Sequence, residues 1–182
     1  MYDYLLQIST VIRYKIRILK IIYIIRHAKS DQRFWGNDFE RPLNEKGYSD
    51  ARMMAKRLLE KQLKIDTLVA SPAVRAQKTA ELFAETLQMP TADILYISAL
   101  YHAPAEIFYD VLADLPDSSN AVALFSHNPG ITHFVNSLAV KVDIDNMPTC
   151  AIFAIRADIG HWTEFFKAKK EYLFFDYPKN NP

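Results

Sequence analysis

Two histidines and two arginines stand directly after short apolar runs of the sequence, or one turn beyond them. His27 follows Arg26 at the end of the run KIIYII, and His127 follows AVALFS. Arg75 lies four residues after Ser71, which closes another apolar run. Guanidinium groups bind phosphate oxygens in pairs, and a neutral imidazole beside them can attack phosphorus. We therefore expect phosphoryl transfer, with His27 as the nucleophile and Arg26, Arg75 and His127 holding the phosphoryl oxygens.

The apolar runs have the length and composition of strands covered on both faces, and helical patterns separate them. Such alternation predicts an α/β fold: a mostly parallel central sheet with helices on both faces, here ending in a C-terminal antiparallel edge hairpin. The carboxyl ends of parallel strands share one edge, so the four residues above should meet there. We expect strands at Ile21–Ile25, Asp66–Ala70, Ile94–Ile97 and Ala121–Phe125, and the hairpin at Thr149–Arg156 and His161–Phe166.

Helix-start residues precede the helical patterns. Asn44 is the expected N-cap of a first helix, and Ser71-Pro72 is the expected N-cap and first-turn proline of a second. Two further helices are expected over Pro104–Leu115 and Pro129–Ala139. The core-facing side of the first helix is predicted to carry Ala51, Met54, Ala55, Leu58 and Leu59.

Composition excludes several classes of function. The net charge of +1 over 182 residues gives no field for a nucleic-acid partner, and no apolar stretch is long enough to span a bilayer. The single cysteine, Cys150, lies in an apolar run, is expected to be a buried small side chain, and favours the cytoplasm. The five histidines show no metal-ligand spacing and no nucleotide-binding glycine motif occurs, so we predict neither a metal nor a cofactor.

Residues 1–19 are treated apart from residues 20–182, which we expect to form one domain. Alternation of apolar and basic residues between Val11 and Leu19 is typical of a half-buried strand. The segment is thus either an additional edge strand or a leader translated from an upstream start, and it contributes none of the chemistry above.

Four ordered motifs carry a resemblance to a known family. RHAKS follows the first strand, RPLNEKG spans Arg41–Gly47, and SPAVRAQKTA and SHNPG follow later strands. Together they resemble the histidine phosphatase superfamily, and within it the SixA-type phosphohistidine phosphatases. The resemblance implies a phosphoglycerate-mutase-like fold and a phosphorylated His27, with Arg26, Arg75 and His127 around the phosphate. Within the same motifs, Arg41, Ser30 and Asn128 are expected to bind substrate.

The resemblance leaves open which group protonates the leaving atom. Ester-cleaving members of the superfamily usually have an acidic residue for this step, and the matching stretch, Ser98–Glu106, has no clear equivalent. Glu106 is the available carboxyl group, but at a helix start it is equally typical of a first-turn capping charge. The SixA-type branch likewise has no obvious acid.

We accordingly expect a metal-independent phosphatase that hydrolyses phosphohistidine on a protein through a phosphohistidine enzyme intermediate. The short stretch between Ser71 and His127 leaves no room for a cap, so a side chain displayed on another protein could enter. The alternatives are a phosphomonoesterase or mutase for a small metabolite, and a non-catalytic phosphate-binding regulatory module. Neither a nucleic acid nor a membrane is an expected partner, and the sequence does not indicate an oligomeric state.

Overall fold

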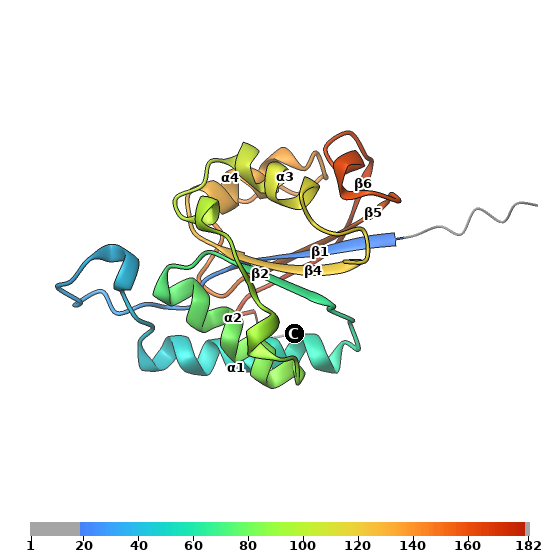
Figure 1. Cartoon of the computed structure of the whole chain (residues 1–182). Helices are drawn as coiled ribbons and strands as arrows, with labels where there is room; N and C mark the ends of the chain where they lie inside the picture. Colours follow the sequence, from blue (N-terminus) through green and yellow to red (C-terminus); the bar gives the residue numbers. More distant parts are fainter. Residues whose placement is uncertain (1–18, 181–182) are drawn as a thin grey trace, which may run out of the picture.

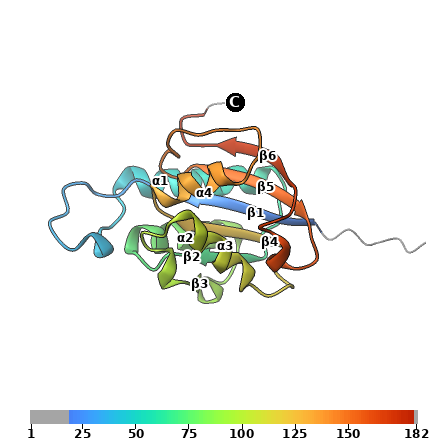
Figure 2. The same ribbon diagram turned by 90° about the horizontal axis from the view of Figure 1, so that it is seen from above.

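A six-stranded mixed sheet forms the centre of the protein. The computed structural model describes residues 19–180, so the predicted leader or edge strand lies outside the described residues except for Leu19. The spatial order of the strands is β3-β2-β4-β1-β5-β6, with β1 to β4 parallel and β5 antiparallel to both of its neighbours (Figure 2). The strands are β1 (Leu19–Arg26), β2 (Thr67–Ala70), β3 (Leu95–Tyr96), β4 (Ala121–Ser126), β5 (Ile152–Asp158) and β6 (Lys170–Asp176).

Helices cover both faces of this sheet (Figure 1). Helices α1 and α2 lie on one face, and α3 and α4 lie on the other. This arrangement confirms the predicted α/β architecture. The helices are α1 (Glu45–Glu60), α2 (Val74–Leu87), α3 (Ala105–Ala113) and α4 (Gly130–Ser137), and short 3-10 segments are η1 (Asp38–Glu40), η2 (Thr91–Asp93), η3 (Ser98–Leu100) and η4 (Trp162–Glu164).

The central strand β1 is buried on both sides, which explains its continuous apolar run. Ile22 and Ile24 belong to the core under α3 and α4, whereas Tyr23 and Ile25 belong to the core over α1 and α2. Side chains alternate between the faces of a strand, so a strand between two helical layers needs apolar residues at every position. Because its side chains are buried in the cores on both faces of the sheet, β1 has a fixed position. The residues that follow Ile25, including His27, start from that fixed strand end.

Helix α1 begins as predicted. The side chain of Asn44 accepts a hydrogen bond of 2.9 Å from the backbone N–H of Gly47, which is the expected N-cap contact. Most of the predicted inner face is buried, but Leu59 is 51% exposed, so its assignment to the core was wrong. Successive residues of an α-helix point about 100° apart, so Leu59 lies outside the side of α1 that faces the sheet, whereas Leu58 lies on it.

Helix α2 begins later than predicted. Ala73 is its N-cap, and Ser71 and Pro72 precede the helix. The Ser71 hydroxyl accepts from the backbone N–H of Ala73 at 3.4 Å, and it also lies 2.8 Å from Nε2 of His127. A tertiary contact with His127, the residue after β4, has therefore replaced the N-cap role that the sequence favoured for Ser71.

The C-terminal antiparallel pair is present, but its second strand was assigned to the wrong residues. Trp162 and Phe165 are both 1% exposed, three residues apart, and they enter the core from the single turn η4. The indole N–H of Trp162 donates to the carbonyl of Ser119 at 2.8 Å, which fixes this turn. The strand that pairs with β5 is β6, formed by KEYLFFD.

Gly130, the first residue of α4, marks a close backbone approach beside the strand ends. A Cβ atom there would lie 1.7 Å from the carbonyl oxygen of Ala103, whereas one on Gly160 would meet its nearest neighbour at 4.0 Å.

We predict that Gly130→Ala lowers the free energy of unfolding by at least about 2 kcal/mol, because the backbone must move to admit the methyl group. Gly160→Ala is the matched control and should change it by less than about 0.5 kcal/mol in urea denaturation. Equal effects of the two substitutions would contradict the close packing at Gly130.

Candidate active site

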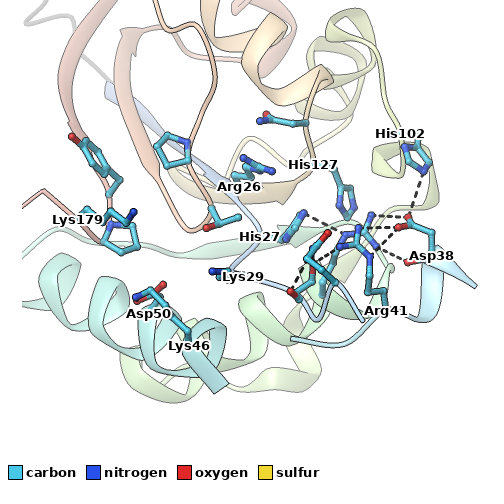
Figure 3. A pocket seen from close by; sticks show the side chains of 18 residues that line it. Arg26, His27, Lys29, Asp38, Arg41, Lys46, Asp50, His102, His127 and Lys179 are labelled. Carbon is cyan, nitrogen blue, oxygen red and sulfur yellow. Dashed lines mark hydrogen bonds and ion pairs between the residues drawn. The ribbon is translucent and has the colours of Figure 1, made fainter. Parts of the chain in front are cut away.

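A cavity of about 690 Å³ opens at the carboxyl ends of the central strands. Side chains from β1, the loop after it, α1, α2 and the segment after β6 line it (Figure 3). The structure brings to this one cavity the predicted site residues Arg26, His27, Ser30, Arg41, Arg75, His127 and Asn128.

His27 is held in one orientation and one tautomer. Its Nδ1 lies 2.7 Å from the carbonyl oxygen of Ala28, which can only accept, so Nδ1 carries the proton. Nε2 therefore keeps its lone pair and accepts a hydrogen bond of 3.3 Å from Nε of Arg75. The backbone of His27 is fixed as well, because its N–H donates to Ser126 on β4 at 3.0 Å. The partner on the second imidazole nitrogen, which the sequence did not reveal, is thus a neighbouring backbone carbonyl.

The His27 imidazole stays neutral. Burial of the ring, 6% exposed, lowers its pKa to about 3, and the charges of Arg75 and Arg26 act in the same direction. The hydrogen bond to Ala28 favours the protonated ring but does not outweigh burial. A neutral imidazole with an unprotonated Nε2 inside a cationic cavity can act as a nucleophile at neutral pH.

Asp38, which the sequence analysis did not single out, connects the arginines of the cavity. Its carboxylate accepts from Nη2 of Arg75 at 2.9 Å and from Nε and Nη2 of Arg41 at 3.1 and 2.8 Å. Its backbone carbonyl accepts from Nη1 of Arg75 at 2.6 Å, and the Tyr101 hydroxyl donates to the carboxylate at 3.0 Å. A separation of three residues allows Asp38 and Arg41 to form a local ion pair, which a sequence can suggest. The contact with Arg75 joins residues 37 positions apart, and no local pattern in the sequence points to it.

The Asp38 carboxyl group is ionised at neutral pH. Burial would raise its pKa, but hydrogen bonds from Arg41 and Tyr101 and the charge of Arg75 lower it to about 2. Asp38 therefore orients Arg75 and Arg41 as an anion, and it holds no proton to donate at neutral pH.

His127 faces His27 across the cavity, with ring centroids 5.1 Å apart. The ring is 3% exposed, and burial lowers its pKa to about 2, helped by the proximity of His27 and Arg75. Ser71 holds Nε2, whereas Nδ1 is buried without a hydrogen-bond partner among the described residues. His127 is therefore also neutral, and its orientation depends on the residue that sequence reasoning assigned to a helix cap.

Arg26 spans the floor of the cavity. Nη1 donates to the carbonyl of Met147 at 2.6 Å, and Nε is buried without a partner among the described residues. Burial lowers the pKa of Arg26, with Arg41 and Arg75 adding to the effect. Guanidinium groups crowded in this way create a strong preference for an anion.

The residues predicted to bind substrate differ in what they contact. The Ser30 hydroxyl accepts from Nη1 of Arg41 at 2.5 Å, so these two residues act as a pair at the cavity wall. The Asn128 amide group instead contacts Asn146, Met147 and Thr132, linking α4 to the loop before β5. Its polar atoms are occupied by the protein.

Glu106 does not line this cavity. It lies in the first turn of α3 and borders a separate cavity of about 360 Å³ with residues of η4. The carboxylates that do line the site are Asp38 and Asp50, and Asp50 pairs with Lys46 at 2.9 Å. The placement gives Glu106 no access to a leaving group bound beside His27.

Cys150 is fully buried, as expected, and burial raises the pKa of its thiol. Its backbone N–H donates to the carbonyls of Arg26 and His27 at 3.1 Å. Within residues 19–180, no three His, Cys, Asp or Glu side chains are grouped as metal ligands. No helix in that same range has the length and apolar character to cross a bilayer.

The two buried neutral histidines should make stability depend on pH. An unfolded imidazole has a pKa near 6.5, whereas His27 and His127 resist protonation until about pH 3 and pH 2 in the folded protein. Stability is therefore present above pH 6.5 and is lost as pH falls, by about 1.4 kcal/mol per pH unit for each histidine. Urea denaturation between pH 6 and pH 4 should show a slope about 1.4 kcal/mol per pH unit shallower for His127→Gln. Parallel slopes for variant and wild type would contradict a neutral His127.

Comparison with known proteins agrees with the site. Residues 22–94 match the sequence model of the histidine phosphatase superfamily, branch 1, a range that includes Arg26, His27, Arg41 and Arg75. An uncharacterized protein of Picosynechococcus sp. is 34% identical over 64 residues, which are 35% of this chain and 39% of that protein. The chain thus matches well under half of the length of this relative.

Solved structures extend the similarity to nearly the whole chain. The protein histidine phosphatase SixA, complexed with tungstate, superimposes with a TM-score of 0.76 at 22% identity, over 88% of this chain and 98% of that one. A putative phosphohistidine phosphatase SixA from Agrobacterium tumefaciens gives 0.72 at 22% identity, over 87% and 99%. A mycobacterial glucosyl-3-phosphoglycerate phosphatase gives 0.59 at 14% identity, over 85% and 97%. The resemblance to the histidine phosphatase superfamily is thereby confirmed, in sequence over residues 22–94 and in fold over most of the chain, with SixA structures among its strong matches.

Proposed function

We propose that this protein is a phosphatase that hydrolyses phosphohistidine on another protein, with His27 as its covalent nucleophile. The observation that carries the proposal is the fixed tautomer of His27. The Ala28 carbonyl holds the proton on Nδ1, and burial prevents protonation of Nε2, which points at Arg75. A protein that only binds phosphate needs the cationic side chains, but it does not need the unprotonated nitrogen of His27 among them.

The reaction then proceeds in two displacements. Nε2 of His27 attacks phosphorus, the bond from phosphorus to the substrate nitrogen breaks, and the departing imidazole takes a proton from solvent. Water next attacks the phosphorus on His27, the bond to Nε2 breaks, and inorganic phosphate leaves. Nε–H of Arg75, which contacts Nε2 in the free protein, donates to a phosphoryl oxygen once phosphorus occupies that position.

Fixed cations provide the stabilisation that this transfer needs. Arg26, Arg75 and Arg41 lie around the cavity as permanent charges, and His127 serves as a neutral hydrogen-bond donor. Charge develops on the phosphoryl oxygens, so donors that are already oriented lower the barrier without reorganising. Every step is assigned to residues of the chain, and we accordingly propose that catalysis needs no metal.

The substrate preference follows from the state of the acidic groups. Asp38 is an anion held by arginines, Asp50 is paired with Lys46, and Glu106 lies elsewhere. An alkyl phosphate expels an alkoxide-like oxygen unless an acid protonates it, and such an acid contributes about 10²–10⁴-fold. Phosphohistidine can gain its proton from solvent and leave as neutral imidazole. The site therefore favours a phosphorus–nitrogen bond.

A small-molecule phosphomonoesterase is the second candidate. His102 lines the cavity, is 58% exposed in its side chain, and lies 3.7 Å from Asp38 through Nε2. Among the described residues, His102 is a lining imidazole that is open to solvent and lies beside Asp38, so it is the candidate acid under this alternative. The similarity in fold to the mycobacterial glucosyl-3-phosphoglycerate phosphatase supports this alternative. The similarity to the two SixA structures supports the phosphohistidine phosphatase.

The remaining assignments belong to the same proposal. Residues 20–182 constitute the catalytic domain, Arg41 and Ser30 contact the substrate side of the phosphoryl group, and Asn128 supports them through the loop before β5. A protein substrate and a single buried thiol favour a cytoplasmic location.

The covalent intermediate provides the first test. His27→Ala should lower turnover of a phosphohistidine-bearing protein by more than about 10³-fold, because it removes the unprotonated Nε2 that accepts the phosphoryl group. The variant should still bind inorganic phosphate through the arginines. His133→Ala, an exposed histidine on α4, is the control and should retain full turnover. Wild-type protein quenched at alkaline pH should carry phosphate on His27 by mass spectrometry. Turnover by His27→Ala within tenfold of wild type would exclude the mechanism.

Substrate preference provides the second test. We expect kcat/KM to be highest for phosphohistidine, lower for nitrophenyl phosphate with its acidic leaving group, and lowest for alkyl phosphates by about 10²-fold or more. Glu106→Gln should leave all three values unchanged. If alkyl phosphates react as fast as phosphohistidine, and His102→Gln removes only that activity, the phosphomonoesterase assignment is correct instead.

A further inference from the structure

The loop between β1 and α1, which contributes Gln32, Asp38 and Arg41 to the cavity lining, also carries a fully exposed tryptophan. Trp35 is 99% exposed, and the loop protrudes from the carboxyl end of β1 in both overall views (Figures 1 and 2). Singly exposed aliphatic side chains are ordinary, but an indole solvated over its whole surface, on a loop whose other residues line the cavity, is available to a partner. We propose that Trp35 is the anchor with which this protein binds its phosphohistidine-bearing protein substrate, an inference that rests on the proposed function.

Both limbs of the loop are anchored to the body of the protein, on either side of Trp35. Ser30 and Leu43 form an antiparallel bridge at its base, and the N–H of Asp31 donates to the carbonyl of Pro42 at 2.9 Å. Its outer limb is held by the ion pair of Asp38 with Arg75. Such anchoring lowers the conformational entropy that binding would otherwise cost.

The tip of the loop directs the indole outward. A Cβ atom on Gly36 would lie 2.5 Å from the Phe34 ring, which shows that this ring folds over the glycine. Phe34 is 37% exposed, whereas Trp35 beside it makes no such contact and is solvated throughout. Large aromatic side chains contribute much of the binding energy of protein interfaces when a partner buries them.

The opposite flank of the cavity is basic. Figure 3 shows Lys46 and Lys179 on the far side of His27 from Asp38, with Lys29 between. Six of the lining residues are cationic and two are carboxylates, and the cavity is larger than a phosphoryl group requires. A partner that presents its phosphohistidine between the indole and these lysines must carry acidic side chains next to that histidine.

The kinetic test compares substrates that differ only in whether they reach the loop. Trp35→Ala should lower kcat/KM for a phosphohistidine-bearing phosphotransfer domain by about 30-fold, through KM, because anchor residues of this class carry that share of binding. For free phosphohistidine, kcat/KM should change less than twofold. Phe166→Ala removes an aromatic residue that is 66% exposed but borders other cavities, and it should alter neither value.

Lys179→Gln tests the basic flank. We expect kcat/KM for the phosphotransfer domain to fall about threefold and its dependence on salt concentration to weaken, because a rim charge acts mainly on encounter. The loss for free phosphohistidine should be smaller and should depend less on salt concentration, because free phosphohistidine presents no acidic side chains to this flank. A loss for the protein substrate that is equal in high and low salt would contradict an acidic partner.

Fluorescence provides a direct measure of contact. The chain has two tryptophans, and Trp162 is 1% exposed, so the exposed indole of Trp35 supplies the variable signal. In a His27→Ala background, a phosphorylated domain without tryptophan should shift the emission to the blue in a saturable manner. The same titration with Trp35→Phe should give no shift.

The outcomes separate this inference from the function on which it rests. Failure of wild type to hydrolyse both the phosphorylated domain and free phosphohistidine would refute the proposed function, while a fluorescence shift with the phosphorylated domain would still support the anchor. Equal loss of both substrates in Trp35→Ala, or no shift on titration, would refute the anchor alone. A shift produced by anionic lipid vesicles and not by the domain would identify a membrane contact and refute the protein partner.

Discussion

The chemistry of this site depends on one hydrogen bond, from Nδ1 of His27 to the carbonyl oxygen of Ala28. An imidazole with a free lone pair is normally half protonated near pH 6.5, and a nearby carboxylate would favour the charged ring further. A backbone carbonyl accepts the hydrogen bond without adding a negative charge, so burial and the surrounding cations determine the protonation state. The ring is thereby fixed in the tautomer that leaves Nε2 unprotonated, as the proposed nucleophilic role requires. A carboxylate as the partner of His27 would orient the ring equally well, but it would reduce the cationic character that draws the phosphoryl group in.

The carboxylate of Asp38 instead pairs with the arginines of the cavity and not with His27. Asp38 neutralises part of Arg41 and Arg75 and holds both in position before any substrate arrives. Crowded guanidinium groups destabilise one another, and an anion between them relieves that repulsion. Under the proposed function, a phosphoryl dianion would share these cations with Asp38, so its binding would exchange partners of guanidinium groups that are already in position. The same residue anchors the outer limb of the loop that carries Trp35, which links the charge balance of the site to the surface beside it.

The sequence was sufficient for the sheet, the helix order and the convergence of the strand-end residues, because buried strands require uninterrupted apolar runs and parallel strands bring their ends together. It was insufficient where contacts between distant residues decide the outcome. Ser71 has the composition of a helix cap, yet His127 engages its hydroxyl. Asp38 is an ordinary loop aspartate until Arg75, on another element, reaches it. Trp162 alternates like a strand residue, but the core accepts it from a single helical turn. Each of these depends on packing that no local pattern encodes.

The strand order also determines when the site can come into existence during synthesis. Strand β1, which leads into His27, is made first, but its two neighbours are β4 and β5, roughly 100 and 130 residues further along the chain. At translation rates of about 5–20 residues per second, β1 remains without a sheet partner on the order of 10 s. A nascent chain that ends before or within β4 does not yet contain His127. One that ends before β5 lacks one of the two strands that flank β1. The surroundings of His27 are therefore incomplete until β5 has been made, and β1 is the strand of β1 to β6 that waits longest for its first partner.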